Sequence, residues 1–280
     1  MNRLYLVVVL FVLQPIYCQI LKKEGDIIVE VTTHALATAK DVATADKSST
    51  VFYFGKTGLL QEKVHYLKTP DSQPDYVEAY TYNKKGKPVQ MVTWASGNNK
   101  LKPLYETKYI YDRDERLTDA SVFNAGKRSV FVKVVHEYDS VGNNIKTLHE
   151  PDDYLEKAYT KDRKLEGIRQ IHADTLKWEC NFTYKDDFRT GTFSSRYNNS
   201  TAFSTEEITI NGKATNRYTS SSSTDDKTKY YYDETGLLEK TEHYTYSASS
   251  GYVLQSYSTI KVTGNVNQEL VKKINEVIVE

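Results

Sequence analysis

Three histidines recur at one position of a repeated sequence pattern. His65, His149 and His243 each lie seven residues after a turn glycine, and the chain has six histidines in all. In a regular sheet, residues at the same position of each repeat lie at the same level along their strands. Such an alignment could form a row of metal or ligand contacts. The three fall in early, middle and late copies, however, and lack the i, i+2 or i, i+4 spacing of zinc ligands. We therefore predict no metal site.

The other groups capable of chemistry favour structural roles. Paired carboxylates such as Asp152-Asp153 continue into neither an EF-hand loop nor a Gly-Asp repeat, so they are interpreted as solvated turns. Cys180 shares a strand face with Trp178 and Phe182, which predicts a buried thiol rather than a nucleophile. No nucleophile elbow, P-loop or dinucleotide fingerprint occurs in the sequence. We predict no catalytic residue and no cofactor.

The candidate ligand-binding residues are aromatic. Tyr66, Trp94 and Tyr244 each lie eight residues after a turn glycine. Repeated exposed rings on one sheet face would stack on sugar rings or anchor a protein partner. The alternative is that the rings pack across neighbouring strands and replace part of a thick core. Both interpretations stay open on the sequence alone.

The elements that carry these residues are predicted to be β-hairpins. From Leu176 to Tyr184, apolar and polar residues alternate, which is typical of a half-buried strand. In the repeated pattern Asp or Asn then opens a turn, and a glycine three residues later supplies a positive φ. The chain has 23 Tyr against 9 Phe and 2 Trp. This composition suits half-buried strands, because the tyrosine ring packs while its hydroxyl stays hydrated.

Copies of this hairpin recur through most of the chain. The best-matching pair begins Thr57-Gly-Leu-Leu and Thr235-Gly-Leu-Leu, and the last strand residue before each turn falls at positions 54, 82, 111, 138, 184, 210 and 232, with a weak copy near Thr160. We predict an all-β chain, as an antiparallel meander or open solenoid-like sheet of about eight hairpin repeats with a short helix at either end. The sequence does not determine whether the array closes on itself.

Three of the turns resemble a known motif. The segments Tyr138-Asp-Ser-Val-Gly142, Tyr232-Asp-Glu-Thr-Gly236 and Tyr111-Asp-Arg-Asp-Glu115 are similar to the YD repeats of RHS-type cell-surface proteins, in degenerate form. The resemblance covers roughly residues 50 to 262. The period here is longer than is usual in that family, and Glu115 stands where glycine is expected. The resemblance implies an extracytoplasmic β-repeat and no particular activity.

The N-terminus has the pattern of a secretory signal peptide. Arg3 precedes the apolar run Leu4–Leu13, which is broken before a cleavage region. We expect cleavage before Gln19, which removes residues 1–18 and leaves no transmembrane segment in the mature chain. The alternative is lipid attachment at Cys18.

Cysteine usage bears on the compartment. After cleavage only Cys180 is left, so the exported chain has no internal disulfide, whereas eukaryotic secreted proteins of this size are commonly cross-linked. We therefore favour the periplasm, the outer-membrane surface or the extracellular side of a bacterial envelope over eukaryotic secretion. Asn-x-Ser/Thr triplets such as Asn181-Phe-Thr keep a eukaryotic source open.

Two end segments differ from the repeat array. We assign residues 19–50 to an N-terminal cap, in which residues 34–49 are rich in Ala and Thr and predict a short helix or a loop. Residues 51–264 are assigned to the hairpin domain and residues 265–280 to a C-terminal cap. A strand is one interpretation of this last segment, and a helix is the other, with an apolar stripe formed by Leu270, Val271, Ile274, Val277 and Ile278.

Charge balance narrows the class of ligand. Lys+Arg and Asp+Glu both number 37, which leaves no broad field to attract nucleic acid or anionic lipid. We predict an exported, non-catalytic repeat protein that acts in binding or cell-surface interaction, with a glycan or protein ligand and no nucleic acid. The alternatives are an envelope polysaccharide hydrolase that uses paired carboxylates on neighbouring hairpins and a structural subunit of an envelope complex.

Overall fold

A computed structural model describes residues 27–36, 46–68, 70, 72–97, 100–127, 129–150, 152–185, 188–195, 201–208, 214–220 and 225–279. The predicted signal peptide, residues 1–18, and Cys18 lie outside the described residues. The described chain folds almost entirely as β-strands, with one helix close to its C-terminal end. No helix in this part of the chain combines the length and the apolar character of a membrane span.

The strands follow one another closely along the chain. The first nine are β1 (Ile27–Ala35), β2 (Asp46–Phe54), β3 (Leu60–Tyr66), β4 (Tyr76–Tyr82), β5 (Pro88–Gly97), β6 (Lys100–Tyr111), β7 (Leu117–Asn124), β8 (Val130–Tyr138) and β9 (Asn144–Glu150). The others are β10 (Asp153–Tyr159), β11 (Leu165–His172), β12 (Thr175–Lys185), β13 (Phe188–Ser195), β14 (Thr201–Ile208), β15 (Ala214–Ser220), β16 (Asp225–Tyr232), β17 (Leu238–Ser247) and β18 (Gly251–Thr263), followed by helix α1 (Gln268–Val279).

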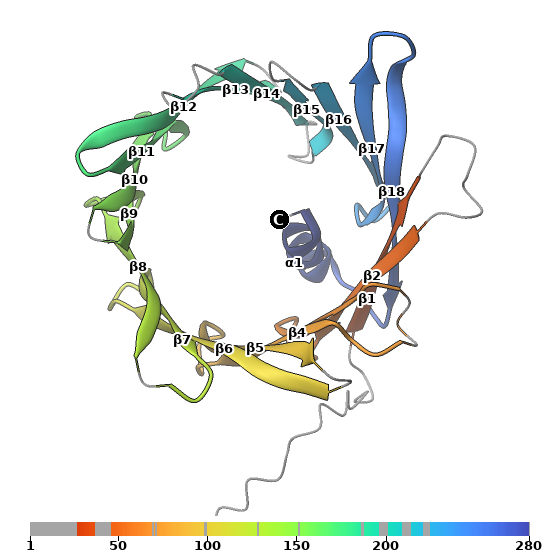
Figure 1. The fold of residues 1–280 in the computed structure, drawn as a ribbon, viewed down its shortest axis with the longest axis horizontal. Coiled ribbons are helices and arrows are strands. Elements are labelled where there is room, and N and C mark those ends of the chain that lie inside the picture. Colours follow the sequence, from red (N-terminus) through yellow and green to blue (C-terminus); the bar gives the residue numbers. More distant parts are fainter. Residues whose placement is uncertain are drawn as a thin grey trace, which may run out of the picture.

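These strands form one antiparallel sheet whose pairings run around a ring (Figure 1). From β2 to β18, each strand pairs with the next one along the chain. Strand β1 pairs with β2 on one side and with β18 on the other. The predicted all-β antiparallel meander is confirmed. Strand β1 joins the two ends of the array, a feature that the repeat pattern does not reveal.

Six of the repeat turns share one backbone geometry. In each turn, the amide of the opening residue donates to the carbonyl four residues later, and the amide three residues later donates back to the opening carbonyl. The opening residues are Gly55, Asn83, Asp112, Asp139, Thr160 and Asp233. The residue three positions later has φ between 62° and 92° in all six turns. The predicted positive φ is confirmed, and it persists where Glu115 and Arg163 replace glycine.

The preference for Asp or Asn at the opening position has a side-chain reason. Oδ1 of Asp139 accepts hydrogen bonds from the backbone amides of Val141 at 3.0 Å and Asn143 at 2.8 Å. The side chains of Asn83 and Asp112 accept the equivalent pairs of amide hydrogen bonds. The opening side chain therefore satisfies turn amides that the strand ladder leaves unpaired.

In five of the described hairpins, the tyrosine before the turn ties the hairpin to the preceding one. The Tyr138 hydroxyl donates to the carbonyl of Leu117 at 2.8 Å, and Leu117 is the first residue after the preceding turn. Four other tyrosines make the equivalent bond: Tyr82 to Leu60, Tyr111 to Pro88, Tyr159 to Asn144 and Tyr184 to Leu165. This inter-hairpin bond gives the tyrosine a structural role even in copies that have lost the Asp or the Gly.

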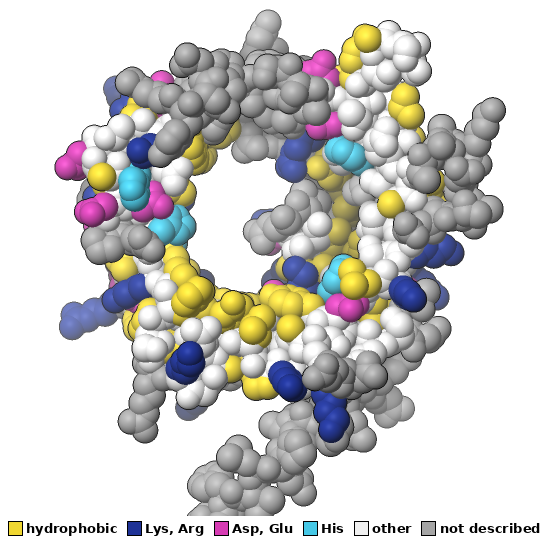
Figure 2. Space-filling model, viewed as in Figure 1, with side chains coloured by type: hydrophobic (Ala, Val, Ile, Leu, Met, Phe, Trp, Pro, Cys, Tyr) yellow, Lys and Arg dark blue, Asp and Glu magenta, His cyan; other side chains and the backbone are white. Residues whose placement is uncertain are grey.

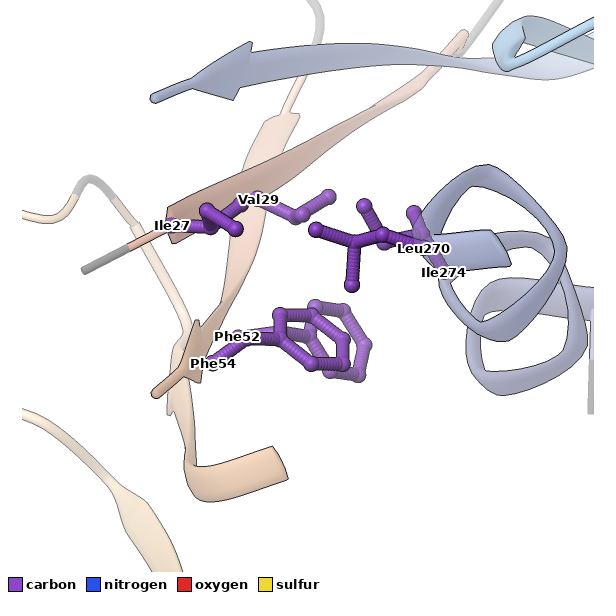
Figure 3. Packing of buried hydrophobic residues seen from close by; sticks show 6 residues of the cluster. All are labelled: Ile27, Val29, Phe52, Phe54, Leu270 and Ile274. Atoms are coloured by element: carbon purple, nitrogen blue, oxygen red, sulfur yellow. The ribbon is translucent and has the colours of Figure 1, made fainter. Parts of the chain in front are cut away.

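The largest apolar core lies inside the ring, between helix α1 and strands β1 and β2 (Figures 1 and 3). Figure 3 shows Leu270 and Ile274 of the helix pointing toward apolar side chains of the two strands, Ile27, Val29, Phe52 and Phe54. The helical interpretation of the C-terminal stripe is confirmed. This segment packs on the inner face of the sheet, where it buries apolar surface that one sheet layer cannot bury alone.

The same helix contacts two repeat turns. Asn275 Oδ1 accepts a hydrogen bond from the Leu238 amide at 2.9 Å, and its Nδ2 donates to the Gly236 carbonyl at 2.9 Å. At the other turn, a Cβ added to Gly58 would lie 3.1 Å from Leu270 Cδ1. The two best-matching copies, near residues 57 and 235, are therefore the two that pack against α1. Their similarity reflects a shared packing partner as well as a shared turn.

The segment assigned to an N-terminal cap contains strands of the sheet. Residues 27–35 form β1, and β2 starts at Asp46, before the expected start of the hairpin domain at residue 51. Of the predicted helix or loop over residues 34–49, the first two residues end β1 and the last four open β2. Residues 37–45 lie outside the described residues.

Candidate functional site

The strand register identifies the residues that face the interior of the ring. Directly opposed residues on paired strands share a face of the sheet. Phe52 contacts α1 and therefore faces inward. It opposes Lys63, which opposes Glu78, which in turn opposes Thr93. Glu78 therefore faces inward, and so does every second residue of β4 counted from it. The residues directly opposite these on the adjacent strands face inward as well.

Tyrosines dominate the inner face of β4 and β6. We call this surface the tyrosine wall, which consists of Tyr76, Tyr80, Tyr82, Tyr105, Tyr109 and Tyr111. Strand β5 lies between the two strands and adds Met91 and Thr93 to the same face. The six tyrosines are half-buried, whereas outward-facing neighbours such as Thr81, Lys108 and Ile110 are exposed.

The hydroxyl groups of the wall are engaged by the protein itself. Glu78 accepts hydrogen bonds from Tyr76 at 3.0 Å and from Tyr80 at 2.6 Å. Three further hydroxyls bond to backbone carbonyls or to sulfur: Tyr82 to Leu60 O, Tyr111 to Pro88 O and Tyr109 to Met91 Sδ. The part of these side chains left for a ligand is therefore the ring surface.

Burial raises the pKa values of tyrosines in the wall further above neutral pH. It is the largest cause of the raised pKa of Tyr80, followed by the hydrogen bond to Glu78. Burial, with added repulsion from Tyr109 and Tyr111, raises the pKa of Tyr82 to about 12. Burial also raises the pKa of Tyr109 and of Tyr111. These phenols stay neutral at physiological pH, so the wall presents aromatic rings without phenolate charge.

The tyrosine wall borders an opening through the ring. Figure 2 shows this opening with hydrophobic side chains, a class that includes Tyr, along its lower border. Figure 1 places β4 to β7 on that side. Helix α1 packs instead against β1, β2 and the adjoining part of β18. The wall is an aromatic surface that the helix leaves uncovered.

The phase-matched histidines lie apart, and two of them make the same local contact. His65 Nδ1 lies 3.2 Å from Thr50 Oγ1, and His243 Nδ1 lies 3.4 Å from Thr228 Oγ1, each across one strand pair. His149 is on β9, far from both along the sheet order. Among the described residues, no group of three His, Cys, Asp or Glu side chains is placed to hold a metal ion.

The predicted aromatic row is divided between two places on the outer face. Tyr66 is 3% exposed and packs with Val64 and Val77, and Trp94 packs against the same cluster. Tyr244 lies on β17, which is separated from β3 by β18, β1 and β2. The ligand-binding role of these three residues stays a prediction. A ligand would reach the Tyr66 ring only after the cluster around it moved.

Tyr244 belongs to a cluster around Glu242 that the repeat phase does not predict. The carboxylate accepts hydrogen bonds from the Tyr244 hydroxyl at 2.6 Å, the Tyr231 hydroxyl at 2.5 Å and the Lys240 ammonium at 2.6 Å. Burial alone would raise the pKa of Glu242, but the three hydrogen bonds together outweigh it and lower the pKa to about 2. The negative charge of Glu242 is thus balanced by Lys240 within the cluster, which is typical of a structural ion-pair network.

The tyrosine wall is not among the residues that follow the repeat turns, where the predicted aromatic row lies. The wall residues precede the turns, in the patterns Tyr80-Thr-Tyr82 and Tyr109-Ile-Tyr111. This alternation shows that both tyrosines of each pair share a face. It does not show which face is inward, since that depends on where α1 packs.

Comparisons with known proteins show no family membership. No protein-family model matches the chain, and no curated protein matches its sequence. The resemblance to YD repeats therefore stays a prediction at the family level. The shared turns and tyrosine contacts are features of this chain itself.

Several solved structures show distant likeness in fold. A porin-like protein from Bacteroides uniformis has a TM-score of 0.40 and 11% identity, over 85% of this chain and 97% of that one. A TcdB2-TccC3-Cdc42 structure has a TM-score of 0.35 and 12% identity over 71% of this chain. The chain spans 14% of the length of that second protein. Likenesses this distant assign no function.

Proposed function

We propose that this chain is an exported, non-catalytic binding protein that holds a glycan against the tyrosine wall inside its ring. The observation that carries the proposal is the wall itself, whose rings are half-buried and whose hydroxyls are mostly engaged by the protein. Sugars present apolar C–H faces with polar edges, and such ligands suit flat rings beside a few polar groups. Export is proposed from the sequence pattern of residues 1–18.

The state of the carboxyl groups supports binding over hydrolysis. A glycosidase of the paired-carboxylate type needs a general acid whose pKa is raised. Among the described residues, the carboxyl groups with a shifted pKa all have it lowered by hydrogen bonds, to which a neighbouring positive charge adds in all but Asp139 and Asp233: Asp112, Glu115, Asp119, Asp139, Asp233, Glu242 and Glu269. Such groups are suited to fixing turns and ion pairs.

A glycan array followed by calorimetry tests the proposal. Tyr80→Leu and Tyr109→Leu keep apolar bulk but remove the rings, and each is expected to weaken binding on the order of tenfold, which corresponds to about 1.4 kcal/mol. Tyr246→Leu is the matched control, because Tyr246 is 47% exposed on β17 and lies outside the wall. The control is expected to bind as the unchanged protein does.

The same assay separates the wall from the aromatic row predicted on the outer face. If Trp94→Leu and Tyr244→Leu lost binding while the two wall variants bound as the unchanged protein does, the site would lie on the outer face and the proposal would be contradicted. Release of reducing sugar from a bound glycan would instead favour the hydrolase. An array without any ligand for the unchanged protein would leave a protein partner as the remaining class.

A further inference from the structure

A polar cluster continues the inner face beyond the tyrosine wall, on strands β8, β9 and β10. His136 Nδ1 lies 3.2 Å from Thr147 Oγ1 and 3.1 Å from Asn144 Nδ2. Asn144 Oδ1 accepts hydrogen bonds from the Thr147 hydroxyl at 3.0 Å and the Lys157 ammonium at 3.2 Å. We call these four residues the His136–Lys157 cluster.

The register places this cluster on the same face as the wall. Tyr109 of the wall opposes Ala120, which opposes Val134, and His136 follows two residues later on β8. His136 opposes Thr147, which opposes Leu155, and Lys157 follows two residues after Leu155. Figure 1 places β8, β9 and β10 on the left of the ring. The cluster and the wall therefore face the same interior.

Two tyrosines frame the cluster. The Tyr159 hydroxyl donates to the carbonyl of Asn144 at 3.0 Å, and Tyr138 is bound in the same way to the preceding hairpin. Both side chains are half-buried, and each lies two residues after a cluster member on its own strand. Tyr111 of the wall, Tyr138 and Tyr159 make the equivalent backbone hydrogen bond on β6, β8 and β10, and in this way lead from the wall to the cluster.

The cluster holds positive charge without a carboxylate partner. In the part of the chain that the structure describes, the Lys157 ammonium has one hydrogen-bond partner, the amide oxygen of Asn144. Asp119, the carboxyl group whose charge acts on His136, pairs with Lys133 at 2.8 Å. Asp153, on the same strand as Lys157, accepts a hydrogen bond from Gln170 at 3.1 Å. An ammonium that is partly removed from water gains most from an anion placed beside it.

The titration behaviour agrees with this charge distribution. Burial lowers the pKa of Lys157. Burial also lowers the pKa of His136, and the neighbouring positive charges of Lys157 and His149 lower it further, against a weaker opposing effect of Asp119. The basic groups on three adjacent strands repel one another. A bound anion would relieve that repulsion.

We propose that the His136–Lys157 cluster binds the acidic group of a glycan, so that the ligand on the tyrosine wall is an anionic sugar chain. This inference rests on the proposed function and adds the chemical class of its ligand. The acidic group is a carboxylate or a sulfate ester. Both carry the negative charge that would pair with the Lys157 ammonium, whose present partner is the neutral amide of Asn144. The rings of the wall contact the sugar faces, and the Lys157 ammonium with the Nδ2 group of Asn144 binds the anion.

Calorimetry on the full-length protein with three defined sugars tests this inference. The probes are trigalacturonic acid, the neutral trisaccharide obtained by reducing its carboxyl groups, and 6-sulfated galactotriose. We expect at least one acidic probe to bind on the order of tenfold more tightly than the neutral one. Lys157→Met should abolish that preference and leave the affinity for the neutral sugar within about twofold of its original value.

Lys146→Met is the matched control, because it removes the same charge from the outer face of the adjoining strand, where Lys146 lies over the Tyr154 ring at 3.9 Å. The control should keep the preference for the acidic sugar. Equal losses in both lysine variants would assign the preference to long-range charge and overturn the proposed site.

The outcomes also distinguish the ligand class from the proposed function. Equal affinity of the unchanged protein for acidic and neutral sugars would overturn the anion site while leaving glycan binding intact. Loss of all sugars in Tyr109→Leu, with the acidic preference lost only in Lys157→Met, would support both. Failure of the unchanged protein to bind any sugar, here and on the array, would overturn both.

Discussion

The tyrosines that precede the repeat turns, such as Tyr111 and Tyr138, belong to one hairpin and form a hydrogen bond with the hairpin before it. Each hydroxyl reaches back to a carbonyl just after the preceding turn, as Tyr111 does to Pro88 at 2.8 Å. Register shifts occur beside the turn-preceding residue in this hairpin and in others of the array. An irregular ladder leaves carbonyls without strand partners, and the phenol fills that need.

Removing one such hydroxyl should therefore destabilise the fold measurably. Tyr111→Phe keeps the ring and leaves the Pro88 carbonyl unpaired, with an expected loss of about 1 kcal/mol in the free energy of unfolding. Urea denaturation followed by circular dichroism measures the change. Tyr252→Phe is the control, since the Tyr252 side chain is 44% exposed at the tip of a hairpin. Equal stability of the two variants would contradict the tethering role.

Glu242 gives the fold a pH dependence of known sign. Its pKa in the folded protein is about 2, below the ordinary value of 4.5, so its contribution to stability is complete above pH 4.5 and disappears as the pH falls toward 2. Glu242→Gln should lower the free energy of unfolding by about 1 to 2 kcal/mol at pH 7. The difference from the unchanged protein should shrink at pH 3.

Denaturation curves at pH 7, 4.5 and 3 check this prediction. Glu276→Gln is the control, because the Glu276 side chain is 60% exposed on α1 and its ion pair with Lys272 spans 3.9 Å. A difference for Glu242→Gln that did not change with pH would mean that the carboxylate charge is not what stabilises the cluster.

At the scale of elements, α1 supplies the second layer that a single sheet lacks. Ile274 has no exposed surface, and it packs with side chains of β1 and β2. Ile274→Ala should cost about 3 kcal/mol through lost burial and the cavity left behind. Lys272→Ala, at a side chain 80% exposed on the same helix, should cost little.

Thermal denaturation measures the stability loss, and limited proteolysis of the C-terminal segment shows whether α1 detaches first. Early cleavage within residues 268–279 in Ile274→Ala alone would show that the helix is held chiefly by this contact. If Lys272→Ala were cleaved as readily, the packing of Ile274 would not be the cause.

The elements divide into those that local sequence predicts and those that depend on distant contacts. The turn at Thr160 was predicted although glycine is replaced by Arg163, because the flanking alternation and the spacing persist. The residues of α1 indicate a helical stripe, although the sequence alone leaves a strand open as the other interpretation. Strand β1 was not predicted, since the sequence after Ile27–Ala35 lacks the repeat-turn motif and the pairing partners of β1, β2 and β18, are set by the whole array.

The candidate site follows the same division. The alternation of Tyr80 and Tyr82, and of Tyr109 and Tyr111, is local and visible in the sequence. The face on which they lie is fixed by Phe52 and its contact with α1, more than two hundred residues later. The His136–Lys157 cluster requires three strands in register, so spacing along the chain carries no sign of it.

At the scale of the whole molecule, β1 decides whether the array has free edges. An unpaired strand edge exposes backbone groups that promote association with other chains, and pairing both ends of the meander with β1 removes two such edges. The side chains of Thr33 on β1 and Ser258 on β18 meet there, with 2.8 Å between their hydroxyl oxygens. These two residues are 225 positions apart in the sequence.

A disulfide between these positions tests the ring directly. Thr33 and Ser258 are directly opposed, so the double variant Thr33→Cys/Ser258→Cys, made with Cys18→Ser and Cys180→Ala, should oxidise readily. Closing so long a loop should raise the free energy of unfolding by up to about 5 kcal/mol, reversibly with reductant. Thr33→Cys/Ser256→Cys is the control, since Ser256 opposes Ala35 and lies two residues along β18 from the position opposite Thr33. Thiol titration and denaturation with and without reductant measure both effects. If the control pair oxidised as readily as the opposed pair, or if neither did, β1 would not hold the place between β2 and β18 that joins the array into a ring.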